Sequence, residues 1–280
     1  MTTQIGARIP SFIPSIDNVM GGGYVAGSTI LLVSEYGAGG QEMMQTSAVN
    51  FFRAVAANTK QSANAVKQRR AYYISPKMTK DTFYERLQMQ FHLFEDERES
   101  VEEFEKLVTF IDSADLFFAR SGLPRDWYED KERYVLKSRT TDDFGGFTNV
   151  AYRLISVKPN CTVFIDSITA YLPFFHEDAE WSKFLMLLYG VTRGAKKQGV
   201  NLVFLLGEGV LSPEREAELK DCMDVIMHLK WTGESSRQRV MLLEKCPGIL
   251  PTMSAKDLVA FNVTISPGTC FEIATVRKMI

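Results

Sequence analysis

Apolar runs alternate with stretches of helical periodicity over the first two thirds of the chain. The runs at 28–34, 70–75, 107–111, 161–166 and 201–206 are apolar through their centres, which is typical of strands covered on both faces. Between them, apolar positions recur at helical spacing. We expect helices at 41–57, 79–94, 147–157 and 180–198. This alternation predicts an α/β protein with a mostly parallel central sheet flanked by helices.

The pattern changes after residue 206, where strands follow one another quickly. Strands are expected at 225–230, 239–244, 259–263 and 270–273, with no helix between them. Closely spaced strands of this kind predict antiparallel strands at the C-terminal edge of the sheet. No linker of low complexity interrupts the chain, so we expect a single domain over residues 1–280.

Composition excludes several classes of protein. The net charge of −2 gives no general attraction to nucleic acid or to anionic membranes. No apolar run approaches the ~18 residues of a membrane span. The cysteines, Cys161, Cys222, Cys246 and Cys270, are isolated, and the histidines, His92, His176 and His228, have no ligand spacing. We therefore expect a cytoplasmic protein without a metal site or a disulfide framework.

A glycine-rich loop joins the first long strand to the first long helix, the setting in which phosphate-binding loops occur. Their pattern is G-x-x-x-x-G-K-[ST], in which lysine meets the phosphates and the hydroxyl holds Mg²⁺. Here Ser34 replaces the first glycine, Gly40 the lysine and Gln41 the hydroxyl residue. Glu35 and Glu42 add negative charge, which repels phosphate. By itself, the loop also fits an ordinary glycine-rich turn.

Other segments resemble KaiC-like members of the RecA superfamily. Residues 13–23, which read IPSIDNVMGGG, and residues 25–28 are similar to the opening of that family. Residues 162–167 resemble its Walker B strand, and 239–248 resemble the strand and K-x-R-G turn near its C-terminus. The likeness runs over about residues 8–275. It implies a RecA-like P-loop NTPase fold for the single domain.

The resemblance also assigns a vestigial nucleotide site. Its residues would be Gly37, Ala38, Gly39, Gly40, Gln41 and Asp166. Lys245 would be a contact to a neighbouring subunit, although Pro247 replaces the arginine of that turn. Family ATPases carry acids just after the second strand, where residues 75–78 read Ser-Pro-Lys-Met. The joint loss of cation, hydroxyl and acids implies that hydrolysis is lost, with no catalytic or metal-binding residue.

Three functions remain open at this point. The first is a non-catalytic pseudo-ATPase that acts as a regulatory or scaffold subunit, in signal transduction. It would form a homo-oligomer, or a hetero-oligomer with an active paralogue, and bind other protein partners. The second is a protein that binds ATP with little or no hydrolysis, because the backbone N–H groups of residues 37–41 could still cradle a phosphate. The first function requires no cofactor, and the second would have ATP.

The third is a recombinase paralogue that binds single-stranded DNA. In residues 174–183, Glu177, Asp178 and Glu180 outnumber Lys183, and residues 207–221 are acidic as well. DNA-binding loops need cations, so we do not expect nucleic acid as a partner. Phe174, Phe175 and Trp181 are expected in an interface or in the core.

Overall fold

The computed structural model describes residues 7–58, 70–95, 99–118, 123–124, 161–233, 237–247, 259–267 and 270–278. The helix expected at 147–157 lies outside these residues. In chain order, the elements up to the middle of the chain are β1 (Arg8–Ile9), α1 (Pro14–Val19), β2 (Tyr24–Val25), β3 (Thr29–Ser34), α2 (Gly40–Asn58), β4 (Ala71–Ser75), α3 (Lys80–Phe91), α4 (Val101–Leu107), β5 (Val108–Asp112) and α5 (Ala114–Phe118). They are followed by β6 (Thr162–Ile165), two 3₁₀ turns (Ile168–Ala170 and Leu172–Phe174), α7 (Asp178–Gln198), β7 (Asn201–Gly207), α8 (Pro213–Asp221), β8 (Val225–Thr232), β9 (Gln238–Lys245), β10 (Val259–Ser266) and β11 (Cys270–Lys278).

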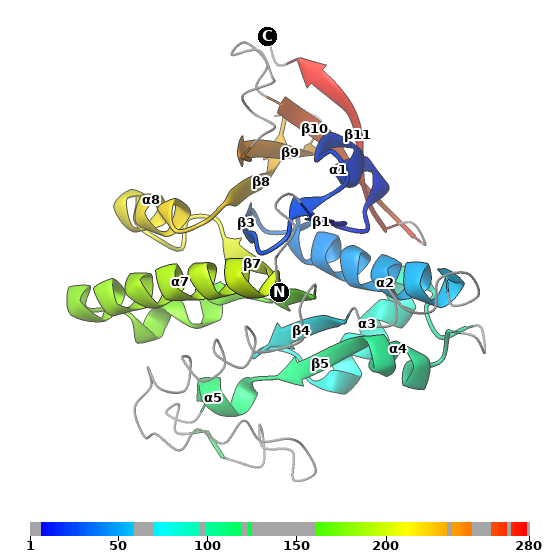
Figure 1. The fold of residues 1–280 in the computed structure, drawn as a ribbon, viewed down its shortest axis with the longest axis horizontal. Helices are drawn as coiled ribbons and strands as arrows, with labels where there is room; N and C mark the ends of the chain where they lie inside the picture. Colours follow the sequence, from blue (N-terminus) through cyan, green and yellow to red (C-terminus); the bar gives the residue numbers. More distant parts are fainter. Residues whose placement is uncertain are drawn as a thin grey trace.

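The main sheet has nine strands in the order β11-β10-β9-β8-β3-β7-β6-β4-β5 (Figure 1). The strands from β8 to β5 are parallel to their neighbours, and β8, β9, β10 and β11 pair antiparallel. This confirms the prediction of a mostly parallel sheet that antiparallel strands extend at one edge.

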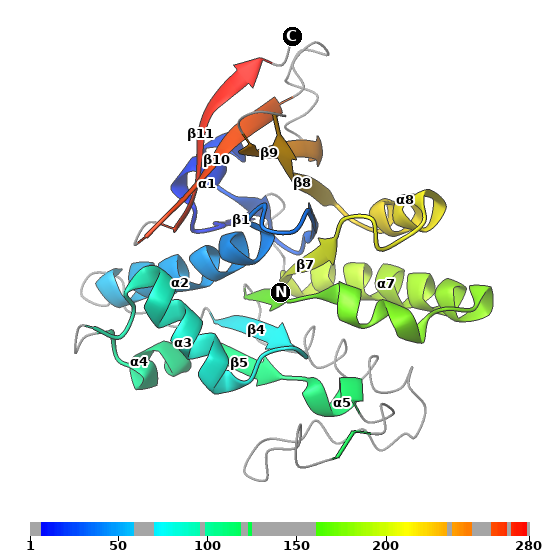
Figure 2. The ribbon, with the colours of Figure 1, turned by 180° about the vertical axis from the view of Figure 1, so that it is seen from behind.

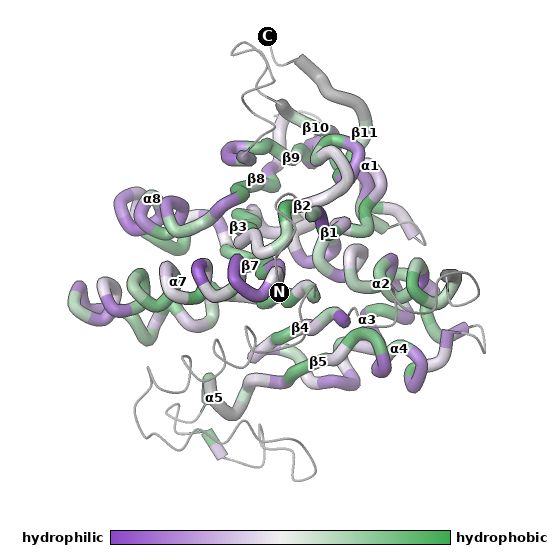
Figure 3. Tube along the Cα trace, viewed as in Figure 1, coloured by the Kyte–Doolittle hydropathy of each residue, from purple (hydrophilic) through white to green (hydrophobic). Residues whose placement is uncertain are grey.

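Helices cover both faces of the parallel part of the sheet. Helices α2, α3 and α4 lie on one face, and α7 and α8 lie on the other (Figures 1 and 2). Alternate side chains of the strands therefore enter two separate cores. On β3, for example, Leu32 packs beneath α2, and Leu31 and Val33 pack beneath α7. Hydrophobic and hydrophilic positions alternate along α7, as a helix with one buried face requires (Figure 3).

The structure corrects the expectation that no helix follows residue 206. Helix α8 lies between β7 and β8 and supplies the crossover between two strands that both pair parallel with β3. Its start is encoded locally, because the Ser212 hydroxyl accepts a hydrogen bond from Arg215 N and Pro213 occupies the first turn. The short polar sequence concealed the helix, since only Leu219 is buried.

One helix boundary also differs from the expectation. Helix α3 ends at Phe91 rather than at 94, because His92 adopts a left-handed backbone with φ 51° and its N–H bonds Gln88 O. Helix α4, which Ser100 caps, follows from Val101 and carries Glu102 and Glu103 in its first turn. Among the described residues, no helix is long and apolar enough to cross a membrane.

Candidate functional site

The glycine-rich loop lies at the carboxyl ends of the parallel strands. It follows β3, which pairs with β7 on one side and with β8 on the other. Asp166 follows β6, and Ser75 ends β4. Because carboxyl ends of parallel strands meet at one edge of a sheet, the fold brings these residues to the same edge.

Two glycines give the loop its shape. Gly37 and Gly39 have φ values of 72° and 110°, in the region that favours glycine. A Cβ at Gly39 would also lie 2.8 Å from Ile265 Cδ1 and 3.3 Å from the Phe271 ring. The antiparallel hairpin of β10 and β11 therefore packs directly against the loop at Gly39.

A side chain at Gly40, the position of the motif's lysine, would overlap its neighbours unless they shifted. A Cβ built there would lie 2.7 Å from Leu205 Cδ1, 2.8 Å from Ser34 Cβ and 2.9 Å from Ser34 Oγ. Ser34 stands where the motif has glycine. The two departures from the motif are therefore coupled, because the Ser34 side chain fills space that a side chain at position 40 would need.

Gln41 is the centre of a chain of hydrogen bonds. Its Nε2 donates to Asp166 Oδ2 at 2.6 Å, and its Oε1 accepts from Arg86 Nη1 at 2.9 Å. The same Asp166 oxygen accepts from the Tyr73 hydroxyl at 2.7 Å. The Asp166 carboxylate, which is 4% exposed, is therefore held by protein donors from α2 and β4.

Tyr73 remains a hydrogen-bond donor at any physiological pH. Burial raises the pKa of its hydroxyl well above the usual value of 10.0, and the neighbouring Asp166 carboxylate raises it further. Arg86 is close enough to oppose this rise in the Tyr73 pKa. A positive charge from α3 thus lies beside the loop, although residue 40 carries none.

Hydrogen bonds also join residues 35–37 of the loop to β8 and β9. Trp231 N donates to Glu35 Oε2 at 3.2 Å, and Trp231 Nε1 donates to Tyr36 O at 3.0 Å. Arg239 Nε donates to Gly37 O at 2.9 Å, and its guanidinium stacks on the Trp231 ring at 4.4 Å. The Tyr36 side chain itself is 89% exposed.

The segment after β4 contains no acid near the loop. Met78, which is 4% exposed, places its sulfur 3.8 Å from Gln41 Nε2. Ser75 is buried and its Oγ accepts from Lys77 N at 3.2 Å. Packing and local turn contacts therefore occupy the place where a general base is expected in a family ATPase.

Lys245 lies away from the loop, at the other end of β9. Its Nζ donates to Lys220 O and Asp221 O, each at 3.4 Å. These carbonyl groups belong to the last turn of α8, where a cation is favourable. Within this chain, Lys245 caps a helix, and Pro247 follows it at the surface.

The aromatic residues of 174–183 are mostly internal. Trp181 and Phe175 are each 4% exposed, and Phe175 stacks on Phe184 with centroids 4.4 Å apart. Arg215 of α8 donates to His176 O and to Asp178 Oδ1, both at 2.9 Å. The segment is thus held against α8 by Arg215. The expectation that Trp181 and Phe175 are interface or core residues agrees with their burial.

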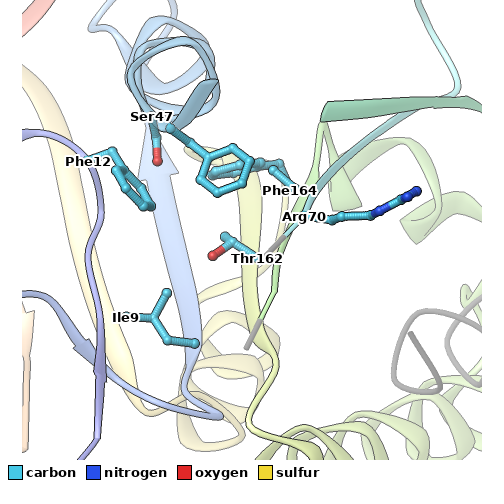
Figure 4. A pocket seen from close by; sticks show the side chains of 8 residues that line it. Ile9, Phe12, Ser47, Arg70, Thr162 and Phe164 are labelled. Atoms are coloured by element: carbon cyan, nitrogen blue, oxygen red, sulfur yellow. The ribbon is translucent and has the colours of Figure 1, made fainter. Parts of the chain in front are cut away.

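A small hollow at the opposite, amino end of the strands is too small for a ligand. It lies between the N-terminal segment, α2 and the starts of β4 and β6, lined by Ile9, Phe12, Ser47 and Thr162, while the Arg70 side chain points away (Figure 4). Its volume of 10 Å³ is at most enough for one water. The described residues contain no group of three or more candidate metal ligands.

Two members of the site, Tyr73 and Arg86, could not be identified from sequence. Tyr73 lies in an apolar strand, and Arg86 is one of several charges on α3. The one available signal is that Arg86 lies three residues after the buried Phe83, on the edge of the apolar face. Gln41 and Asp166, in contrast, were found by their places in the motif.

The residues of the loop do not fit a Mg²⁺–triphosphate complex. Position 40 offers neither an ammonium group nor space for one, and position 41 offers a carboxamide instead of a hydroxyl. Two protein hydrogen bonds engage the carboxylate of Asp166. The donor set for metal and phosphate is therefore replaced by contacts within the chain.

Comparisons with known proteins support the architecture. No protein-family model and no curated protein matches the sequence. The structure is similar to KaiC-like protein PH0186 from the hyperthermophilic archaeon Pyrococcus horikoshii, with TM-score 0.61 and 15% identity over 96% of this chain and 100% of that one. It is also similar to flagellar accessory protein FlaH from Methanocaldococcus jannaschii, with TM-score 0.59 and 12% identity over 93% and 95% of the two chains. The chain therefore has the KaiC/RecA-like fold of the P-loop ATPases.

Proposed function

We propose that this chain is a non-catalytic member of its fold class that acts through protein contacts, as a regulatory or scaffold subunit in signal transduction. The observation that carries the proposal is the packing at Gly40. A lysine there would bring its Cβ to 2.7 Å from Leu205 and 2.8 Å from Ser34. Without that lysine, the loop lacks the cation that meets the β and γ phosphates.

The surroundings of Gln41 support the same proposal. The Gln41 carboxamide joins Asp166 to Arg86, so the Asp166 carboxylate is balanced and hydrogen-bonded without a metal. Met78 fills the neighbouring position with an apolar thioether. An ATPase would need to break this network to place Mg²⁺ and a water there, at a cost of about 1–3 kcal/mol for each buried group left unpaired.

One observation favours the second function, ATP binding with little turnover. Arg86 brings a guanidinium to the carboxamide of Gln41, beside the start of α2. If the Gln41 side chain swung away, Arg86 could meet a phosphate in place of the missing lysine.

ATP binding and phosphate release separate the two functions. We expect purified protein to bind a fluorescent ATP analogue no better with Mg²⁺ than without it, and to release no phosphate above a protein-free blank. Saturable binding that the Arg86→Gln variant abolishes would favour the alternative. Phosphate release that the Asp166→Asn variant abolishes would contradict both.

A set of reverting variants provides the matched control. The Ser34→Gly/Gly40→Lys/Gln41→Thr triple variant restores the motif and removes the Ser34 side chain from the space of the lysine, so that only the flexible end of Leu205 has to move. We expect it to gain Mg²⁺-dependent ATP binding, whereas Gly40→Lys/Gln41→Thr, which retains Ser34, should gain much less. Equal binding by the two variants would contradict the steric argument.

A further inference from the structure

A larger cavity opens at the amino ends of the parallel strands. Its volume is 210 Å³, and its wall includes Arg8, Tyr24 and Val25 from the N-terminal part, and Lys196, Asp224 and Cys246 from the ends of other elements. β3 separates it from the glycine-rich loop by roughly 20 Å, at about 3.3 Å per residue. The cavity is therefore distinct from the nucleotide-type site.

Arg8 brings a charge to this wall that no carboxylate of the described residues balances. Its Nη1 donates to Met20 O and to Gly23 O, each at 2.7 Å, which fixes the guanidinium in place. Within the described part of the chain, neither its Nε nor its Nη2 has a hydrogen-bond acceptor, and it forms no ion pair. A half-buried cation of this kind gains stability from an anion that reaches it.

The other charges of the wall balance each other. Lys196 Nζ lies 2.7 Å from Asp224 Oδ1, and Asp224 Oδ2 accepts hydrogen bonds from Thr29 N and Oγ1, both at 3.0 Å. Both oxygen atoms of the Asp224 carboxylate thus have partners other than Arg8. The cavity keeps a net positive charge on the side of Arg8.

The remaining wall is apolar or nearly so. Tyr24 and Cys246 are 5% and 6% exposed, and in the described structure the Tyr24 hydroxyl has no hydrogen-bond partner. Arg8 and Cys246 both line the cavity, and burial raises the pKa of the Cys246 thiol to about 11 against the opposing effect of the Arg8 charge. A cavity of about 150 Å³ already admits benzene, so 210 Å³ has room for a ring-sized molecule.

We propose that this cavity binds a small organic anion of about the size of benzoate. The carboxylate pairs with the free nitrogen atoms of Arg8, and the apolar body packs against Tyr24, Val25 and Cys246. The match follows from one unbalanced guanidinium at the end of a largely apolar chamber whose other charges, Lys196 and Asp224, pair with each other. The site is independent of the loop at Gly40 and of the function proposed for it.

Equilibrium dialysis of the full chain against radiolabelled benzoate tests the proposal, with benzamide as the neutral molecule of equal shape. We expect benzoate to bind about tenfold or more tightly than benzamide, as a charge-assisted hydrogen bond implies. Inorganic phosphate should compete poorly, because it lacks the apolar body. Equal affinity for benzoate and benzamide, or equal competition by phosphate, would overturn the proposal.

Variants then locate the site. Arg8→Gln should remove the preference for benzoate over benzamide, and Arg193→Gln, on the exposed side of α7, should retain it. Because Arg8 also holds two carbonyl groups, Val25→Trp serves as a second variant that narrows the mouth and leaves Arg8 intact. Benzoate binding that survives in both folded variants would show that the cavity is not the site.

Discussion

The space around the Cα atom of Gly40 is filled by Leu205 and Ser34. In most helices, alanine is more stable than glycine by about 1 kcal/mol, because glycine loses more backbone freedom on folding. At this position steric overlap acts in the opposite direction. The sign of the change in unfolding free energy for Gly40→Ala therefore tests how tightly Leu205 and Ser34 pack around this position.

The first prediction uses that sign. Gly40→Ala should lower the free energy of unfolding by about 1–3 kcal/mol, as overpacking of a tight core does. Gly190, on α7, has no atom within 4 Å of an added Cβ. Gly190→Ala should therefore raise the unfolding free energy by about 0.5–1 kcal/mol. Urea denaturation measures both, and a stabilising Gly40→Ala would contradict the packing.

The second prediction concerns the acceptor that Gln41 and Tyr73 share. Asp166→Ala leaves both donors without an acceptor, and we expect it to lower the unfolding free energy by about 2–4 kcal/mol. Tyr73→Phe removes one donor and should lower it by only about 1 kcal/mol. Denaturation curves of the two variants provide the comparison. Equal losses would mean that Asp166 is not the acceptor that Gln41 and Tyr73 share.

At the scale of elements, the antiparallel pair β8–β9 carries a buried histidine beneath α8. His228 is 8% exposed, and its Nε2 contacts the Glu244 carboxylate, which also lies 3.0 Å from Lys220 Nζ. Burial lowers the pKa of His228, and the charges of Lys220 and Lys230 lower it further, against the opposing effect of Glu244. The imidazole is therefore neutral at pH 7.

The third prediction follows from that direction. The unfolded chain binds a proton at His228 more readily than the folded chain does, so stability falls as the pH drops below about 6.5. We expect the melting temperature of the wild type to fall more steeply between about pH 7 and 5 than that of His228→Gln. Because His228 also helps to lower the pKa of Glu244, the difference between the two profiles reports the titration of this coupled pair. Parallel pH profiles would contradict the prediction.

The observed helices and strands show which parts of the fold can be predicted from the sequence. The parallel strands and the long helices were predictable because their apolar runs are long and bounded by turn residues. Helix α8 was missed, although the Ser212–Pro213 start was present, because a helix with one buried residue has little apolar periodicity. The network at Gln41 was hidden for a different reason, since Arg86 reaches the loop from 45 positions along the chain.

At the scale of the whole molecule, large apolar side chains on the surface bear on whether the chain forms an oligomer. Tyr36 is 89% exposed at the carboxyl end of β3, and Met186 is 65% exposed on α7. Tyrosine and methionine are enriched in protein interfaces relative to the rest of the surface. We propose that the chain assembles with itself or with an active paralogue, as expected for a regulatory subunit of this fold.

The fourth prediction separates the two roles of Lys245. Because its ammonium caps α8 within the chain, Lys245→Ala should lower the unfolding free energy by about 0.5–1 kcal/mol and leave the mass of the assembly unchanged. Light scattering and denaturation measure the two quantities. A change of mass at constant stability would instead show that Lys245 contacts a neighbouring subunit.

The contact between Ser34 and the space above Gly40 has a consequence for descent. A gene that encodes serine at position 34 cannot regain a working lysine loop through one codon change at position 40, because the first mutant misfits before any activity returns. The reversal has to pass through glycine at 34 first, a step that confers no advantage alone. Serine at 34 and glycine at 40 therefore hinder each other's reversal, and lineages that carry both changes should keep them together.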